Sequence, residues 1–177
     1  MEFTFVSGNL GLDFVGTVAA RRERRVDLLA EPADLARWTV AAGLLDAAPP
    51  VPAGALAAGV GLREAIHRLA TAAVAGAPLA AADREVLNRA AAPAPPAVRL
   101  DADGLARTGD LTAALAAVAR SAADLLGGPD AARVRECAAP LCTRLFVDAS
   151  RKGERRWCDM RRCGNRAKAA AFRERRR

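Results

Sequence analysis

The sequence predicts a mainly α-helical protein with short β elements: a helical N-terminal domain followed by a small, treble-clef-like zinc module. Two observations indicate this class. Alanine dominates the apolar residues, which make up 52% of the 177-residue chain, and alanine favours helix. All four cysteines lie near the C-terminus, with a spacing typical of a metal site. We expect the helical domain over residues 1–128 and the zinc module over residues 133–177.

The first part of the helical domain alternates helical patterns with loops. Phe3–Val6 predicts a short strand, and apolar residues recur at helical spacing over residues 10–20. The charged run RRERR, residues 21–25, predicts an exposed end or loop. Pro32 favours the first turn of a helix, and the run APPVP at residues 48–52 should end that helix.

The second part of the domain predicts three more helices and one hairpin. Helical patterns cover residues 54–75 and the stretch from Pro78 to the proline-rich run near residue 92. An Asp-Gly pair between short apolar pairs predicts a β-hairpin within residues 97–108. Asp110 suits the N-cap of a helix that Gly-Gly-Pro at residues 127–129 ends, and we place the domain boundary there.

Charge divides the chain near the same place. Residues 133–177 carry 15 Lys and Arg against 5 Asp and Glu, whereas residues 1–132 carry 12 against 15. A mildly acidic body joined to a strongly basic end favours a polyanionic partner, above all DNA. The alternative is a charge run that is merely solvated.

The cysteines follow the pattern C-x4-C, fifteen residues, C-x4-C. Zinc takes four thiolates in a tetrahedron, and two short pairs joined by a longer loop supply them. We therefore predict one structural zinc ion, bound by Cys137, Cys142, Cys158 and Cys163. A reversible thiol switch and inert cysteines are the alternatives.

The sequence around the cysteines predicts the rest of the module. Residues 143–149 are strand-like, Gly153 permits a turn, and the chain then returns to Cys158, which predicts a hairpin between the two pairs. A helix should follow over residues 165–177, with its alanines against the hairpin. Its basic residues suit phosphate contacts and groove entry. The candidate nucleic-acid-binding residues are Arg161, Arg162, Asn165, Arg166, Lys168, Arg173 and Arg177. Helix capping is the alternative role for Asn165.

Several motifs resemble one bacterial family, the CGNR zinc-finger proteins with an N-terminal ABATE domain. The motifs are LFVDASR at residues 145–151, RRWC at 155–158 and CGNRAK at 163–168, with LDFVGTV at 12–18 and LREAI at 62–66. The family is described as stress-induced transcription regulators, so the resemblance implies zinc at the four cysteines and DNA binding. The chain departs from the usual family residues at Gly16, Thr143 and Asp159, where Asn, Gly and Ser are common; none of these is a metal ligand.

A second hypothesis makes the N-terminal domain a module that binds a small-molecule effector. Its candidate pocket residues are Asp13, Trp38, Arg63 and His67. A core position for Trp38 and surface positions for Arg63 and His67 are the alternatives. An enzyme is not expected, because four thiolates leave zinc no open position for water.

The cellular location and the oligomeric state of the protein can also be predicted. The N-terminus has no basic segment followed by an apolar core, and prolines and glycines break the longest uncharged stretch, so we expect no secretory signal and no membrane span. A cytoplasmic, nucleoid-associated protein follows from this. Because a small DNA reader usually needs a second copy, we also expect a homodimer.

Overall fold

The computed structural model describes residues 2–174 and confirms the expected class, a helical body with a small cysteine-containing module. The α-helices are α1 (Leu10–Val15), α2 (Pro32–Ala41), α3 (Ala55–Val74), α4 (Ala81–Ala91), α5 (Leu111–Gly127) and α6 (Asn165–Glu174). The strands are β1 (Val18–Ala19), β2 (Val26–Asp27), β3 (Ala97–Asp101), β4 (Gly104–Thr108), β5 (Val134–Glu136) and β6 (Leu145–Val147). Two short turns, the 3₁₀ turn η1 (Pro129–Arg133) and the π-helical turn η2 (Met160–Gly164), complete the order.

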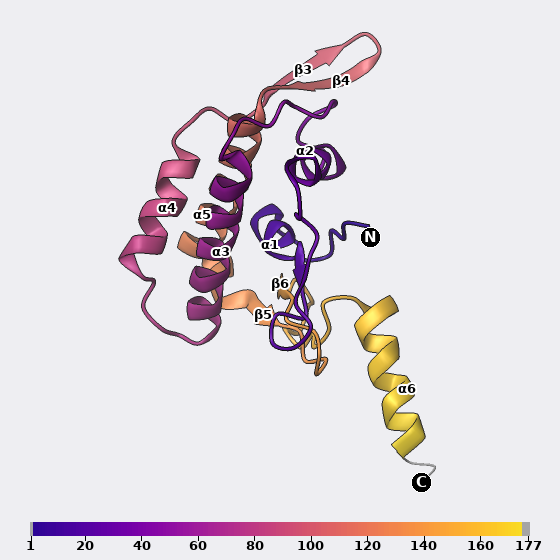
Figure 1. The fold of residues 1–177 in the computed structure, drawn as a ribbon. Coiled ribbons are helices and arrows are strands. Elements are labelled where there is room, and N and C mark those ends of the chain that lie inside the picture. Colours follow the sequence, from indigo (N-terminus) through magenta and orange to yellow (C-terminus); the bar gives the residue numbers. More distant parts are fainter. Residues whose placement is uncertain (1, 175–177) are drawn as a thin grey trace.

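The long helices α3, α4 and α5 pack side by side, and α1 lies against α3 and α5 (Figure 1). Their shared core is built on large apolar side chains that are almost fully buried: Leu12, Phe14, Leu35, Trp38, Leu62, Ile66, Leu69 and Val118. Small residues at the helix contacts allow the helices to approach one another closely. A Cβ added at Gly11 of α1 would lie 2.6 Å from the Cβ of Ala122 on α5 and 3.1 Å from its Cα. Gly11 therefore sets the spacing between α1 and α5.

The N-terminal segment differs from its prediction, because Phe3–Val6 forms no strand. Instead the amides of Val6 and Ser7 donate to Oδ1 of Asp13, at 3.0 and 2.9 Å. The predicted helix over residues 10–20 ends at Val15, and the chain turns at Gly16 into β1. Residues 21–25 form the loop between β1 and β2, as the charge run predicted.

The hairpin within residues 97–108 is confirmed, with Leu100 opposite Leu105 in an antiparallel pair, β3–β4. It extends away from the helices (Figure 1). The predicted cap is also confirmed, since the Ala113 amide donates to Oδ1 of Asp110 at 2.8 Å. Both features are local in sequence, which is why the sequence alone predicts them.

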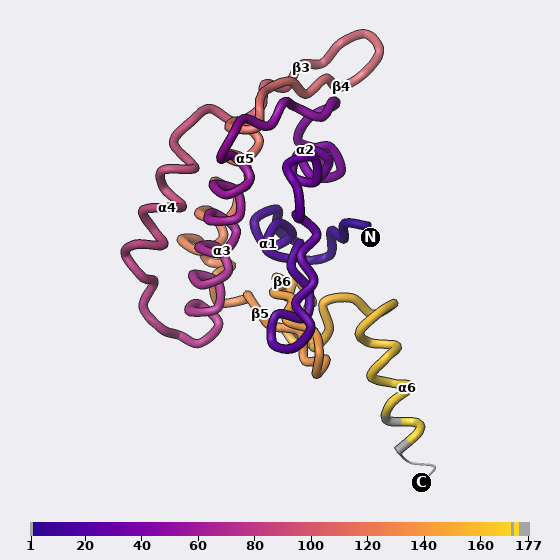
Figure 2. The backbone as a smooth tube through the Cα atoms, in the orientation of Figure 1, coloured from indigo at the N-terminus to yellow at the C-terminus, as the bar shows by residue number. Residues whose placement is uncertain are grey.

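The hairpin of the module consists of a different pair of strands from the predicted one. β6 lies within the expected stretch, but it pairs with β5, before the first cysteine, and residues 154–157 form no strand. Val134, Leu145 and Val147 of this pair join the main core of the body. The Val147 amide also donates to the Ser7 carbonyl at 2.8 Å. Apolar side chains thus join the hairpin to the body, whereas α6 projects from the molecule (Figure 2).

Replacing Gly11 with Ala should destabilise the protein by about 1–3 kcal/mol, because the added methyl would overlap Ala122 and force α1 away from α5. Chemical denaturation measures the change. Gly61→Ala in α3 is the matched control: a Cβ there meets nothing within 4 Å, so this variant should be as stable as wild type or slightly more so. Equal stability of Gly11→Ala and Gly61→Ala would contradict the close helix contact.

Candidate metal centre and basic helix

The four cysteine sulfurs come together at one point of the module, as predicted. They all lie within 4.8 Å of one another, and the Sγ of Cys158 is 3.7 Å from the Sγ of Cys142 and of Cys163. A tetrahedron with zinc–sulfur bonds of about 2.3 Å has sulfur–sulfur edges of about 3.8 Å. No disulfide forms between them. The sulfurs therefore fit a single zinc ion in both their chemistry and their spacing.

Two local structures hold the sulfurs in place. The first pair lies at the end of the β5–β6 hairpin, where the Cys137 amide donates to the Arg144 carbonyl and the Cys142 amide to the Ala139 carbonyl, each at 2.9 Å. In the second pair, Cys158 precedes η2 and Cys163 lies within it, and the Asp159 side chain caps this turn by accepting from the Arg161 amide at 2.9 Å. Hydrogen bonds from backbone amides thus fix the chain around both pairs.

A buried carboxylate shapes the loop between the pairs. Asp148 accepts from the amide and hydroxyl of Ser150, at 2.9 and 2.6 Å, and from the Arg155 amide at 2.9 Å. These hydrogen bonds, the one from the Ser150 hydroxyl first, lower the pKa of Asp148. Hydrogen bonds to the Asp148 side chain, and not the predicted second strand, therefore bring the loop back to Cys158.

Positive and polar groups surround the sulfurs. A guanidinium nitrogen of Arg166 lies 3.3 Å from the Sγ of Cys163, and the Cys158 amide donates to the Sγ of Cys137 at 3.4 Å. The hydrogen bond with Cys158 lowers the pKa of Cys142 to about 5 and raises that of Cys158. Zinc needs the thiolate forms, so the lowered pKa of Cys142 favours metal binding, whereas the raised pKa of Cys158 means that a bound ion would have to displace the proton of that thiol.

The predicted nucleic-acid-binding residues lie on η2 and α6, and six of the seven are described. Arg161, Arg162, Asn165, Arg166, Lys168 and Arg173 are exposed, whereas Arg177 lies outside the described residues. None of the basic side chains among these six forms an ion pair with a carboxylate that the structure describes. The Asn165 side chain donates to the Arg161 carbonyl at 3.3 Å, a local contact that differs from an N-cap, in which the side-chain oxygen accepts from an amide.

The alanine face of α6 has a different neighbour from the one predicted. Ala167 and Ala170 line a groove of about 270 Å³ together with Ala139, Pro140 and Leu141, the loop between the first two cysteines. The alanine face of α6 therefore faces this loop across the groove, and not the hairpin strands.

The four predicted pocket residues occupy separate positions in the body. Asp13 caps the N-terminal segment and Trp38 is in the core, 4.7 Å from the ring of Phe14. Arg63 is fully buried and binds both carboxylate oxygens of Asp27 at 2.7 Å. Burial, and then the charge of Arg21, lower the pKa of His67 to about 4. None of the four lines the cavities that we describe in residues 2–174.

Sequence reasoning missed the arginines that join the module to the body. Arg144 donates to the carbonyls of Thr4 and Gly16, at 3.2 and 3.4 Å, and Arg155 to that of Val6 at 3.2 Å. A Cβ at position 16 would lie 2.3 Å from the Arg144 guanidinium, so the glycine makes room for it. The sequence holds no signal for these contacts, because the partners are more than a hundred residues apart.

Comparison with known proteins agrees with this structure. A family model for the ABATE domain, described as "Putative stress-induced transcription regulator", matches residues 8–129. The model for the CGNR zinc finger matches residues 133–176. A search of curated proteins finds no match. The resemblance inferred from the CGNR motif is therefore confirmed for both parts of the chain.

Cys163→Ser should abolish stable zinc binding, because a hydroxyl does not replace a thiolate in a four-sulfur site. Metal analysis of purified protein should give about one zinc per chain for wild type and far less for the variant. Thr143→Ser, next to Cys142 but not a ligand, is the control and should keep its zinc. A Cys163→Ser protein with a full zinc complement would contradict the assigned ligand set.

Proposed function

The chain belongs to the ABATE family, whose model is described as "Putative stress-induced transcription regulator", and from this premise we propose that it is a zinc-dependent, DNA-binding transcriptional regulator. In this proposal η2 and α6 contact DNA. Zinc would be structural, holding the basic surface in a fixed shape. The N-terminal body would receive the signal.

One observation carries the proposal: a helix whose basic side chains form no ion pair with a carboxylate that the structure describes projects from a small centre suited to metal (Figure 1). Arg166 and Arg173 are seven residues apart and share one face of α6, and Arg161 and Arg162 lie on the preceding turn. Cations without carboxylate partners are available to neutralise phosphates. The helix packs mainly against η2, and most of its described side chains are exposed, so much of its surface is open to a duplex.

The remaining parts of the proposal follow from this role. A regulator of transcription acts in the cytoplasm at the nucleoid, and no helix in residues 2–174 is long and apolar enough to span a bilayer. Two copies would bind DNA as a homodimer and contact two half-sites. Four thiolates around zinc would leave no position for a reacting water, which supports a role other than an enzyme.

DNA binding should depend on zinc and on salt. With a mixed-sequence duplex as the probe, log K should fall against log salt with a slope of about −4 to −5, and chelation should abolish binding. Lys168→Gln and Arg173→Gln should each weaken binding and bring the slope closer to zero by about one. The control is Arg84→Gln, which removes the same charge from an exposed position on α4. Equal binding by the chelated protein, or a flat salt response, would contradict the proposal.

A second candidate function, binding of a small molecule by the body, is favoured by a cavity of about 430 Å³ between α3, α4 and α5. Its walls are mainly apolar, with Leu62 and Leu111 among them, and Arg89 and Thr112 are its polar groups. That composition suits an apolar molecule with one anionic group.

Filling this cavity tests the second candidate. A thermal-shift screen of apolar carboxylates on the full chain should find compounds that stabilise wild type but not Gly61→Leu, whose side chain would occupy the cavity. Gly61→Ala leaves most of the space free and is the control. No stabilising compound, or equal stabilisation of Gly61→Leu, would contradict an effector site there.

A further inference from the structure

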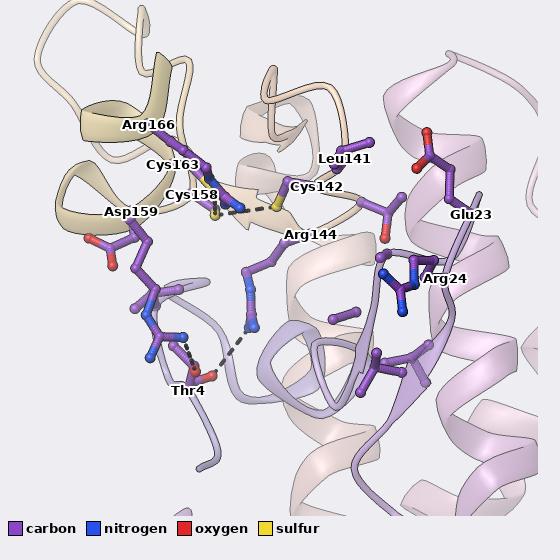
Figure 3. Close-up of a pocket in the computed structure, with 17 residues that line it drawn as sticks. Thr4, Glu23, Arg24, Leu141, Cys142, Arg144, Cys158, Asp159, Cys163 and Arg166 are labelled. Atoms are coloured by element: carbon purple, nitrogen blue, oxygen red, sulfur yellow. Dashed lines mark hydrogen bonds between the residues drawn. The ribbon is translucent and has the colours of Figure 1, made fainter. Parts of the chain in front are cut away.

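A cleft of about 430 Å³ lies where the N-terminal body meets the zinc module. Its walls are the N-terminal segment at Thr4 and Val6, the loop between β1 and β2, and the module on both sides of Cys158 (Figure 3). We call it the junction cleft. Four arginines line it: Arg24, Arg144, Arg162 and Arg166.

None of these arginines forms an ion pair with a carboxylate in the part of the chain that the structure describes. Arg144 donates hydrogen bonds only to the neutral carbonyls of Thr4 and Gly16, and its charge also acts on Asp13 without a direct ion pair. Arg162 makes one long contact, 3.4 Å, to the Thr4 hydroxyl. Arg24 is exposed and its guanidinium has no hydrogen-bond partner among residues 2–174. These guanidinium groups therefore have N–H donors and positive charge available to bind a further group.

The negative charges near the cleft do not use up this positive charge. Arg166 contacts Cys163, so its charge offsets that of the zinc-bound sulfurs. Asp159 caps η2 through the Arg161 amide, and Glu23 is exposed on the β1–β2 loop. In Figure 3 the Arg144 guanidinium turns away from the sulfurs toward Thr4, and Arg24 lies across the cleft from Asp159. The donors thus line different walls of the cleft, and the Arg144 guanidinium is turned away from the sulfurs.

We propose that the junction cleft binds a small phosphate-bearing metabolite, held by Arg24, Arg144 and Arg162. Guanidinium groups bind phosphate oxygens through paired, charge-assisted hydrogen bonds. The volume of about 430 Å³ includes the space beside Cys142, Cys158 and Cys163 where zinc would lie, and the remainder has room for a phosphate group and a small body. Because Arg162 belongs also to the proposed DNA surface, the bound metabolite lowers the affinity for DNA; this regulatory step rests on the proposed function.

Two neighbouring loop residues of opposite charge allow a direct test. In isothermal titration of the zinc-loaded full chain with inorganic phosphate at constant ionic strength, Arg24→Gln should weaken binding about tenfold. Glu23→Gln should strengthen it about threefold, since it removes a repelling charge. Both side chains are exposed and make no hydrogen bond, so the fold should be unchanged; Arg84→Gln on α4 is the charge-matched control and should bind like wild type. No binding at millimolar phosphate, or equal binding by all three variants, would overturn the site.

DNA-binding measurements then test the regulation and the source of the phosphate. Phosphate should lower the DNA affinity of wild type more than chloride of the same ionic strength does, and this difference should shrink in Arg24→Gln. If Arg24→Gln weakens DNA binding without phosphate by as much as Arg173→Gln does, the cleft holds the DNA backbone and the metabolite site is overturned. Phosphate binding by a protein with no affinity for DNA would leave the site intact and refute the proposed function instead.

Discussion

Four sulfur atoms close enough to share one zinc ion hold the C-terminal module together. The cluster of buried residues at the sulfurs has five members. Three of them are cysteines, and the other two are Ala139 and Phe146. Burial of so little apolar surface cannot stabilise a fold of this size, whereas a structural zinc site contributes on the order of 10 kcal/mol. The position of α6 depends on this centre, because the helix starts two residues after the last ligand, Cys163.

The direction in which α6 points depends on a second set of contacts. Arg144 and Arg155 donate to backbone carbonyls of the N-terminal segment, and Asp13 fixes that segment through its amides. Burial, which is the largest effect, raises the pKa of Asp13, while the two amides and the charge of Arg144 oppose the rise. A carboxylate in the body and guanidiniums in the module thus meet at one short segment of chain, and the junction cleft lies beside it.

The parts that sequence reasoning predicted are those encoded locally. Asp110 as a helix cap, the Asp-Gly hairpin and the spacing of the cysteines each depend on residues that are neighbours along the chain. The wrong expectations concern pairing over longer distances. β6 pairs with β5 because Val134 and Val147 both reach the core of the body, and no local pattern reports this. The full burial of Arg63 likewise depends on Asp27, 36 residues away.

The hairpin β5–β6 belongs to two cores at once: Val134, Leu145 and Val147 lie in the core of the body, whereas Phe146 points into the cysteine cluster. Alternate residues of one strand therefore face different halves of the molecule. A finger separated from the body before residue 133 would therefore expose Val134, Leu145 and Val147 to water, and these side chains would need a new apolar partner for the finger to remain soluble on its own.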